Sequence, residues 1–152
     1  LHPGHTSTIR RIEGAMLSYH SDMDINTNPL ELGLDKFLDL DKNFDFIGKN
    51  ALIEIKNKGI TRKQIGLIID DDPMEGPNTY FWNIEKDNLN IGRVTSAVYS
   101  PRLKQNIGLA MVDINYSTIG TKLNVIKGED VCKAEIVEKP FYDPTKSLAK
   151  QN

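Results

Sequence analysis

The sequence of 152 residues has little of several features that would narrow its chemistry at once. It has one cysteine, Cys132, so an internal disulfide is excluded. Its 19 basic and 21 acidic side chains leave a formal net charge of −2, which argues against a protein that binds nucleic acid through a strong positive field. No apolar run reaches the ~18 to 20 residues that a membrane-spanning helix needs. Together with the lack of a signal-peptide pattern, this predicts a soluble, cytoplasmic protein.

Several common functional motifs are also missing. The sequence has no phosphate loop, no G-x-G-x-x-G and no G-x-S-x-G. His2 and His5 have the spacing of a metal pair, but no second pair supports them. The segment 22–28 reads D-x-D-x-N-x-N, yet it lacks the glycine and the final glutamate of a calcium loop, so we expect a solvated loop. Cys132 lies in an alternating strand pattern and is expected to be a structural or surface thiol. We expect no metal site and no self-contained catalytic site.

The first 59 residues have a mixed, partly helical pattern. Ile9, Ile12, Met16 and Tyr19 share one face at helical spacing, which predicts a helix through this stretch. A second helix is predicted over 48–58.

From residue 62 the pattern is typical of short strands separated by turn residues. Frequent turns favour a small antiparallel sandwich or barrel over a parallel sheet. The sequence therefore predicts an α+β fold in which a helical and mixed segment precedes an antiparallel β unit. The predicted strands are Gln64–Ile69, Ile91–Tyr99, Ile107–Ile114, Lys122–Ile126 and Val131–Lys139.

Arg11 is the most suggestive polar residue of the first predicted helix. It borders the apolar face, where a guanidinium can form two parallel hydrogen bonds to a carboxylate of a ligand. The alternative is a surface ion pair with Glu13 or Asp24, which would contribute little to stability. Residue types alone favour the surface pair.

A series of motifs in the correct order resembles the second half of the glycine cleavage T-protein family. The resemblance covers about residues 6 to 145, and although each motif is weak alone, seven in order are specific. The motifs are R-I-E-G-A-M-L-S-Y at 11–19, N-P-L-E-L-G-L at 28–34, F-I-G-K-N-A-L at 46–52, G-R-V-T-S at 92–96 with S-P at 100–101, I-G-L-A-M-V at 107–112, G-T-K-L at 120–123 and P-F-Y-D-P at 140–144.

This resemblance implies part of a tetrahydrofolate-dependent one-carbon transferase. Residues 1–59 would be the end of the folate-binding region and its connection, 60–145 a C-terminal antiparallel β-barrel, and 146–152 a frayed tail. Arg11, with Glu13 beside it, would bind folate or substrate. The family's catalytic aspartate belongs to the half that this sequence does not match, so the isolated chain is expected to be inactive.

The resemblance leaves the reaction open. An aminomethyltransferase would act on a small amine and meet a lipoyl carrier protein, whereas a dimethylsulfoniopropionate demethylase would transfer methyl from a sulfonium substrate. Another alternative is a non-catalytic β-barrel binding module. His20 departs from the family pattern because it stands where glycine is usual. We expect no nucleic-acid or membrane partner.

Overall fold

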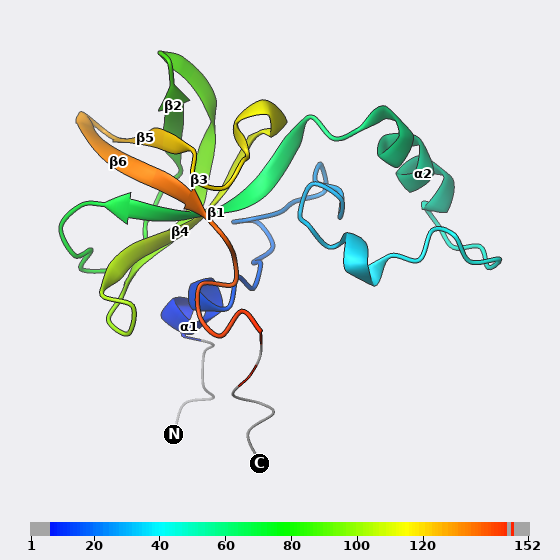
Figure 1. The fold of residues 1–152 in the computed structure, drawn as a ribbon, viewed down its shortest axis with the longest axis horizontal. Helices are drawn as coiled ribbons and strands as arrows, with labels where there is room; N and C mark the ends of the chain where they lie inside the picture. The colour runs from blue at the N-terminus through cyan, green and yellow to red at the C-terminus, as the bar shows by residue number, and fades with distance from the viewer. Residues whose placement is uncertain (1–6, 146, 148–152) are drawn as a thin grey trace.

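A computed structural model describes residues 7–145 and 147, and its main body is a closed β-barrel (Figure 1). Neighbouring strands are antiparallel and close in the order β1-β4-β3-β2-β5-β6. The predicted α+β class is confirmed, and the antiparallel unit is a barrel. The strands are β1 (Arg62–Asp70), β2 (Trp82–Lys86), β3 (Leu89–Ser100), β4 (Gln105–Asp113), β5 (Lys122–Lys127) and β6 (Asp130–Val137).

The barrel interior is filled by apolar side chains at alternate strand positions. Ile65, Leu67 and Ile69 of β1 belong to this core, and the other strands add residues such as Ile84 and Val125. Successive side chains of a strand point to opposite faces, so alternate residues share the interior. Burial of each large side chain stabilises the fold by roughly 1.5–3 kcal/mol. The barrel thus has a complete core of its own.

Strands β3 and β4 are also covered on their outer face, by helix α1 (Thr8–Glu13). Ile12 of α1 is fully buried against Val98, Ile107 and Leu109. Burial on both faces explains the continuous apolar run of β4, from Ile107 to Val112. Helix α1 precedes the barrel in sequence but packs directly on it.

The prediction that the first helix continues through Met16 and Tyr19 is wrong, because the helix ends at Glu13. Gly14 caps the helix, and Ala15 has a left-handed φ of 52°, which stops helical continuation. Met16 and Tyr19, which were expected on the apolar face, are about half exposed, at 50% and 54%. The helical spacing here results from a short helix followed by a turn.

Strand β2 is absent from the predicted set, because its sequence W-N-I-E-K has only two apolar residues. Trp82 and Ile84 are buried, whereas Asn83 between them is exposed. The turn that joins β2 to β3 contains Asp87 and Asn88, with φ values of 51° and 62°. Aspartate and asparagine tolerate this conformation and favour tight hairpins, as the sequence predicts at this turn.

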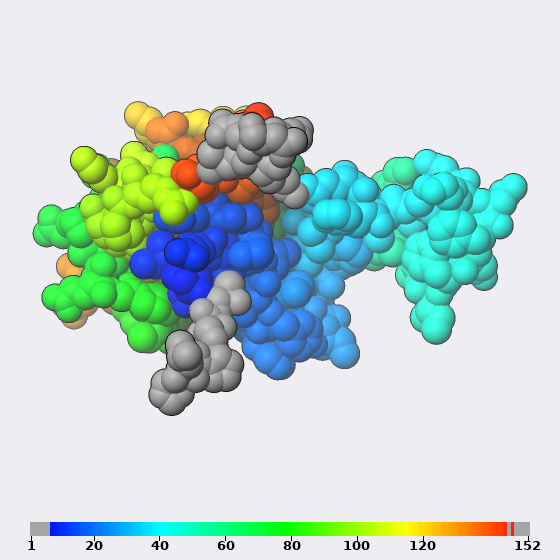
Figure 2. Space-filling view, turned by 90° about the horizontal axis from the view of Figure 1, so that it is seen from below, coloured from blue at the N-terminus to red at the C-terminus, as the bar shows by residue number. Residues whose placement is uncertain are grey.

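Residues 41–59, called the arm below, extend away from the barrel (Figures 1 and 2). The arm contains the second predicted helix, α2 (Lys49–Lys58), and none of its residues is buried. Two short 3₁₀ turns, η1 (Asp35–Phe37) and η2 (Ile114–Tyr116), complete the elements. The arm is therefore the one long stretch of the described chain without a core.

Candidate functional site

Arg11 lies on α1 and binds residues of the loop that follows it and of strand β3. Its Nη1 donates to the carboxylate of Asp22 at 2.6 Å and to the backbone oxygen of Met16 at 2.9 Å. Its Nη2 donates to the hydroxyl oxygen of Ser96 at 2.9 Å. The side chain of Arg11 is 17% exposed. The expected surface pair with Glu13 or Asp24 is thus wrong, since the partner is a buried carboxylate.

Asp22 is the centre of this network. Its Oδ2 accepts from Arg11 and from the backbone N–H of Ser18 at 3.0 Å. Its Oδ1 accepts from the hydroxyls of Thr95 and Ser96, both at 2.7 Å. A buried carboxylate is stable only when donors replace the water that it loses, and here four donors do so. We call Arg11, Asp22, Thr95 and Ser96 the Asp22 network.

The expectation of a solvated loop over 22–28 is therefore wrong for Asp22, which is 2% exposed. The backbone explains its burial, because the N–H of Asp22 donates to the oxygen of Ser18 and a β-bridge joins Tyr19 to Met23. This compact turn points the carboxylate at β3. The signal available in the sequence was the pair Thr95-Ser96, two adjacent hydroxyls between the apolar residues Val94 and Ala97 of β3.

Glu13 forms a second connection between α1 and the barrel. Its Oε1 accepts from the hydroxyl of Ser100 at 2.6 Å, and its Oε2 lies 3.8 Å from Arg102. Its backbone oxygen accepts from the N–H of Tyr142. Glu13 is 4% exposed and does not contact the guanidinium of Arg11 among the described hydrogen bonds. In this structure Glu13 fixes the position of α1, and Arg11 is held by other residues.

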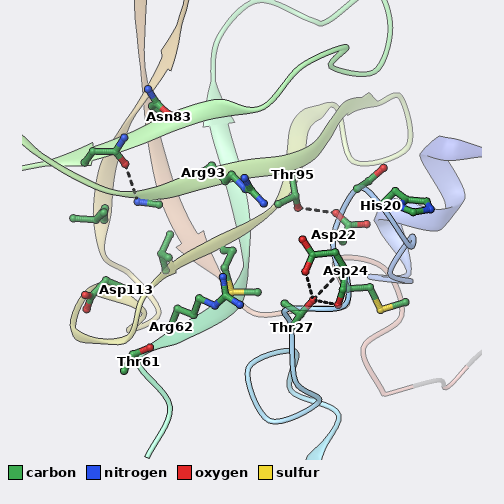
Figure 3. A pocket seen from close by; sticks show the side chains of 17 residues that line it. His20, Asp22, Asp24, Thr27, Thr61, Arg62, Asn83, Arg93, Thr95 and Asp113 are labelled. Atoms are coloured by element: carbon green, nitrogen blue, oxygen red, sulfur yellow. Dashed lines mark hydrogen bonds between the residues drawn. The ribbon is translucent and has the colours of Figure 1, made fainter.

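A pocket of about 490 Å³ adjoins the Asp22 network on the outer face of β1, β4, β3 and β2 (Figure 3). Asp22 and Thr95 belong to the Asp22 network and also line the pocket. Among the described residues, Arg11 and Glu13 do not line the pocket. The volume is in the range of small-molecule sites. Polar residues that line it include His20, Asp24, Arg62, Asn83, Arg93 and Asp113.

The two arginines of the pocket differ in their partners. Arg62 donates to the carboxylate of Glu31 at 2.9 Å and to the backbone oxygen of Asn26 at 2.7 Å. The hydrogen bond to Glu31 raises the pKa of Arg62, against the effect of burial. Arg93 lies 4.5 Å over the ring of Phe81, and it has no carboxylate partner among the described residues. Arg93 is therefore the pocket cation that is available to a ligand.

His20 enters the pocket from a strained backbone position. Its φ of 72° lies in the left-handed region, where a residue with a Cβ is disfavoured. Its ring packs edge-on to Tyr19, with ring centroids 4.5 Å apart. The unusual backbone agrees with a position where the family pattern has glycine.

Lys139 lies close enough to Asp22 and Lys63 for their charges to act on it. The pKa of Lys139 is lowered to about 8, mainly by burial and also by the charge of Lys63, while Asp22 acts in the opposite direction. A lysine amine is strongly hydrated, so its charged form is disfavoured where the protein excludes water.

Metal ligands and membrane helices are not found in the described residues. No group of three or more histidine, cysteine or acidic side chains could hold an ion there, while His2 and His5 lie outside the described residues, as does most of the predicted tail 146–152. None of the described helices could cross a membrane. Cys132 is free and buried, and burial raises the pKa of its thiol, as is typical of a structural cysteine.

Comparisons with known proteins agree with this fold. Residues 62–143 match the glycine cleavage T-protein C-terminal barrel domain. Aminomethyltransferases of Clostridium botulinum (strain Langeland) and Caldanaerobacter subterraneus are 41% and 40% identical over 132 and 134 residues, or 87% of this chain. The chain spans about a third of the length of these relatives, 35% and 34%.

A solved structure gives the same result at the level of the fold. The glycine cleavage system aminomethyltransferase T of Bartonella henselae superposes with a TM-score of 0.80, covering 90% of this chain and 38% of that one, at 20% identity. The barrel, the sequence match over it and this superposition lead to one conclusion: the chain belongs to the glycine cleavage T-protein family, in its C-terminal barrel part.

Proposed function

We propose that this chain forms one wall of the site of a cytoplasmic, tetrahydrofolate-dependent aminomethyltransferase. The observation that carries the proposal is the 41% identity to an aminomethyltransferase over 87% of the chain. The Clostridium and Caldanaerobacter relatives are both aminomethyltransferases by name, which favours aminomethyl transfer over demethylation of a sulfonium substrate. A small amine and a lipoyl carrier protein are the partners that this function would require.

The proposed role of Arg11 rests on the N–H groups that the described hydrogen bonds do not use. A guanidinium has five N–H donors, and the three hydrogen bonds described for Arg11 use three of them. Its side chain is partly exposed. A folate carries carboxylates and ring acceptors, which suit an arginine that is already oriented by Asp22. These residues therefore fit the group, with Arg11 as the contact and Glu13 holding α1 in place.

Tetrahydrofolate, when bound, would supply the nitrogen that accepts the one-carbon unit. The residues of this chain would orient it and exclude water, while catalytic groups would come from the part of the relatives that the chain does not match. From the family match we also propose two domains, with 1–59 as the end of the folate-binding region and its connection and 60–145 as the C-terminal barrel. Residues 7–32 pack on the barrel through the Asp22 network, Glu13 and Glu31. A stand-alone binding module is the alternative to this proposal.

The test uses a hybrid in which this chain replaces the matched third of the Clostridium botulinum enzyme. We expect folate-dependent aminomethyl transfer, and Arg11→Lys should raise the KM for tetrahydrofolate at least tenfold, because lysine lacks the planar fork that directs separate N–H groups at Asp22 and at a ligand. Ser96→Ala is the matched control, since it removes a partner of Arg11 but none of its spare N–H groups.

Two results would contradict the proposal. One is a hybrid that is folded, as shown by an unfolding temperature equal to that of the parent enzyme, but that neither binds tetrahydrofolate nor catalyses the transfer. The other is tetrahydrofolate binding by the isolated chain as tight as binding by the hybrid, which would favour the stand-alone module. If the hybrid does not fold, NMR titration of the isolated chain mixed with the unmatched two thirds of the Clostridium botulinum enzyme decides, and a lack of any tetrahydrofolate-induced shift near Arg11 would rule out the contact.

A further inference from the structure

Three charged side chains that line the pocket have no ion-pair partner among the described residues. They are the guanidinium of Arg93 and the carboxylates of Asp24 and Asp113. Each carboxylate accepts hydrogen bonds from its own loop through Oδ1 alone, at distances between 2.8 and 3.2 Å. The described hydrogen bonds use neither Oδ2, so both acids can accept from a ligand.

The other charged groups of the lining are neutralised within the protein. Arg62 forms an ion pair with Glu31, and Asp22 forms one with Arg11. Asp24 is near enough for its charge to raise the pKa of Arg62, but the two do not form an ion pair. The pocket is therefore left with one unpaired positive charge and two unpaired negative charges. A complementary ligand carries the reverse, two positive charges and one negative charge.

The strand register separates these charges along the pocket. Arg93 of β3 lies opposite Met111 of β4, and Asp113 follows Met111 by two residues. Residues two apart in a strand share a face and lie about 7 Å from each other. Asp24 belongs instead to the loop that follows α1, so it lies at another side of the pocket (Figure 3). An apolar side chain, that of Met111, thus lies between the cation and one of the acids.

Two neutral residues strengthen the end of the pocket near Arg93. Asn83 of β2 pairs directly with Arg93, and the described hydrogen bonds do not use its side-chain amide. The amide can therefore donate to the same ligand group as the guanidinium. His20 also lines the pocket, and its φ of 72° is a strained position of the kind that is concentrated at ligand sites.

We propose that this pocket binds a free basic α-amino acid, with its carboxylate on Arg93, its α-ammonium on Asp24 and its side-chain cation on Asp113. The methylene groups of the ligand would lie on Met111, and a stem of four carbons can span the distance along β4. The volume of about 490 Å³ accommodates such a molecule. The proposal goes beyond the proposed function, because it uses neither Arg11 nor folate.

The experiment titrates the isotope-labelled chain with L-lysine and follows the backbone amides by NMR. Three analogues each lack one charge of lysine: cadaverine lacks the carboxylate, 6-aminohexanoate the α-ammonium and norleucine the side-chain ammonium. We expect lysine to shift amides of β3 and β4 at the pocket and to bind at least tenfold more tightly than each analogue. This series uses the unchanged chain, so it does not depend on whether a variant folds.

Two variants assign the charges to residues. Arg93→Gln should weaken lysine binding at least tenfold and remove the preference for lysine over cadaverine. Asp113→Asn should do the same for the preference over norleucine. Lys122→Gln and Glu135→Gln are the matched controls, because both residues are exposed on the barrel outside the pocket, and they should leave lysine binding unchanged. Thermal unfolding followed by circular dichroism checks that each variant is folded.

Three outcomes would overturn the proposal. The first is a lack of shifts at the pocket up to the solubility limit of lysine. The second is equal binding of lysine and any of the three analogues, or binding that a folded Arg93→Gln variant retains in full. The third is displacement of lysine by tetrahydrofolate, because the pocket would then belong to the folate site. None of these outcomes decides whether Arg11 binds folate, so the two proposals fail separately.

Discussion

The barrel and the arm are regions of similar apolar content in sequence that differ in what their apolar residues do. In β1, Ile65, Leu67 and Ile69 fill an interior, whereas Leu52 and Ile55 of α2 remain partly exposed. Hydrophobic spacing alone predicts both elements, but it does not say what each element packs against. The comparison teaches that similar apolar content produces a core in one region and an exposed surface in the other.

The largest expected difference concerns two carboxylates, one that packs on the barrel and one next to the arm. Asp22→Ala should lower the free energy of unfolding by about 3–5 kcal/mol, because it leaves the partly buried Arg11 unpaired. Asp39→Ala, which removes the exposed partner of Lys42 near the arm, should cost less than ~0.5 kcal/mol. Urea unfolding followed by circular dichroism measures both. Similar values for the two variants would contradict the central role of Asp22.

A second pair of variants compares the apolar residues directly. Leu67→Ala should cost about 2–5 kcal/mol, because the side chain is fully buried in the barrel. Leu52→Ala in α2 should change the unfolding free energy of the isolated chain by no more than ~0.5 kcal/mol. A large loss from Leu52→Ala would show that the arm packs on the barrel in solution.

Lys139 gives the stability of the chain a dependence on pH. Its pKa is lowered to about 8 in the folded protein, so between this value and its ordinary pKa the unfolded chain binds more protons. Stability should therefore rise as the pH increases from about 8 to about 10. Lys139→Met should abolish this rise and stabilise the protein at pH 7 by on the order of 2 kcal/mol.

Thermal unfolding across this pH range measures the effect of Lys139→Met. Lys58→Met, which removes the same charge from the exposed arm, is its control and should leave the midpoint within a degree or so of the original at pH 7. A parallel pH profile for Lys139→Met and the unchanged chain would contradict the assignment.

The smallest expected effects come from two left-handed residues. His20→Gly should stabilise the barrel unit by about 1 kcal/mol, since glycine tolerates the φ of 72°. Gly48→Ala, at the start of α2 with a φ of 91°, should reduce the helicity of the arm without changing the unfolding of the barrel. Calorimetry measures the stabilisation by His20→Gly, and far-ultraviolet circular dichroism measures the loss of helicity in Gly48→Ala. Destabilisation by His20→Gly would mean that the imidazole supports the fold.

Much of the fold could be predicted from the sequence because most of its signals are local. Alternation with turn residues identifies five of the six strands, and Gly48 and Gly59 bound α2. Strand β2 was missed although W-N-I-E-K alternates, because the strand is only five residues long and has only two inward apolar residues, Trp82 and Ile84. The end of α1 at Glu13 was missed because Met16 and Tyr19 continue the helical spacing after the helix has ended.

The site was less predictable, because its partners are far apart in the chain. The sequence places Arg11 at the border of an apolar face, but Ser96 is 85 residues away and only the closed barrel brings the two together. Asp22 resembles part of a loop with calcium-like spacing, and its burial depends on a turn that spacing does not encode. A resemblance of motifs could indicate Arg11 but not the residues that hold it.

The Asp22 network has a consequence for how the chain could be divided. Residues 7–32 are joined to the barrel by Asp22 to Thr95 and Ser96, by Glu13 to Ser100, and by Glu31 to Arg62, although the arm separates them in sequence. A protease that cuts within the arm would break the backbone but none of these contacts. The two fragments should then migrate as one particle and part only in denaturant, so the arm is a covalent bridge across a unit that non-covalent contacts already hold together.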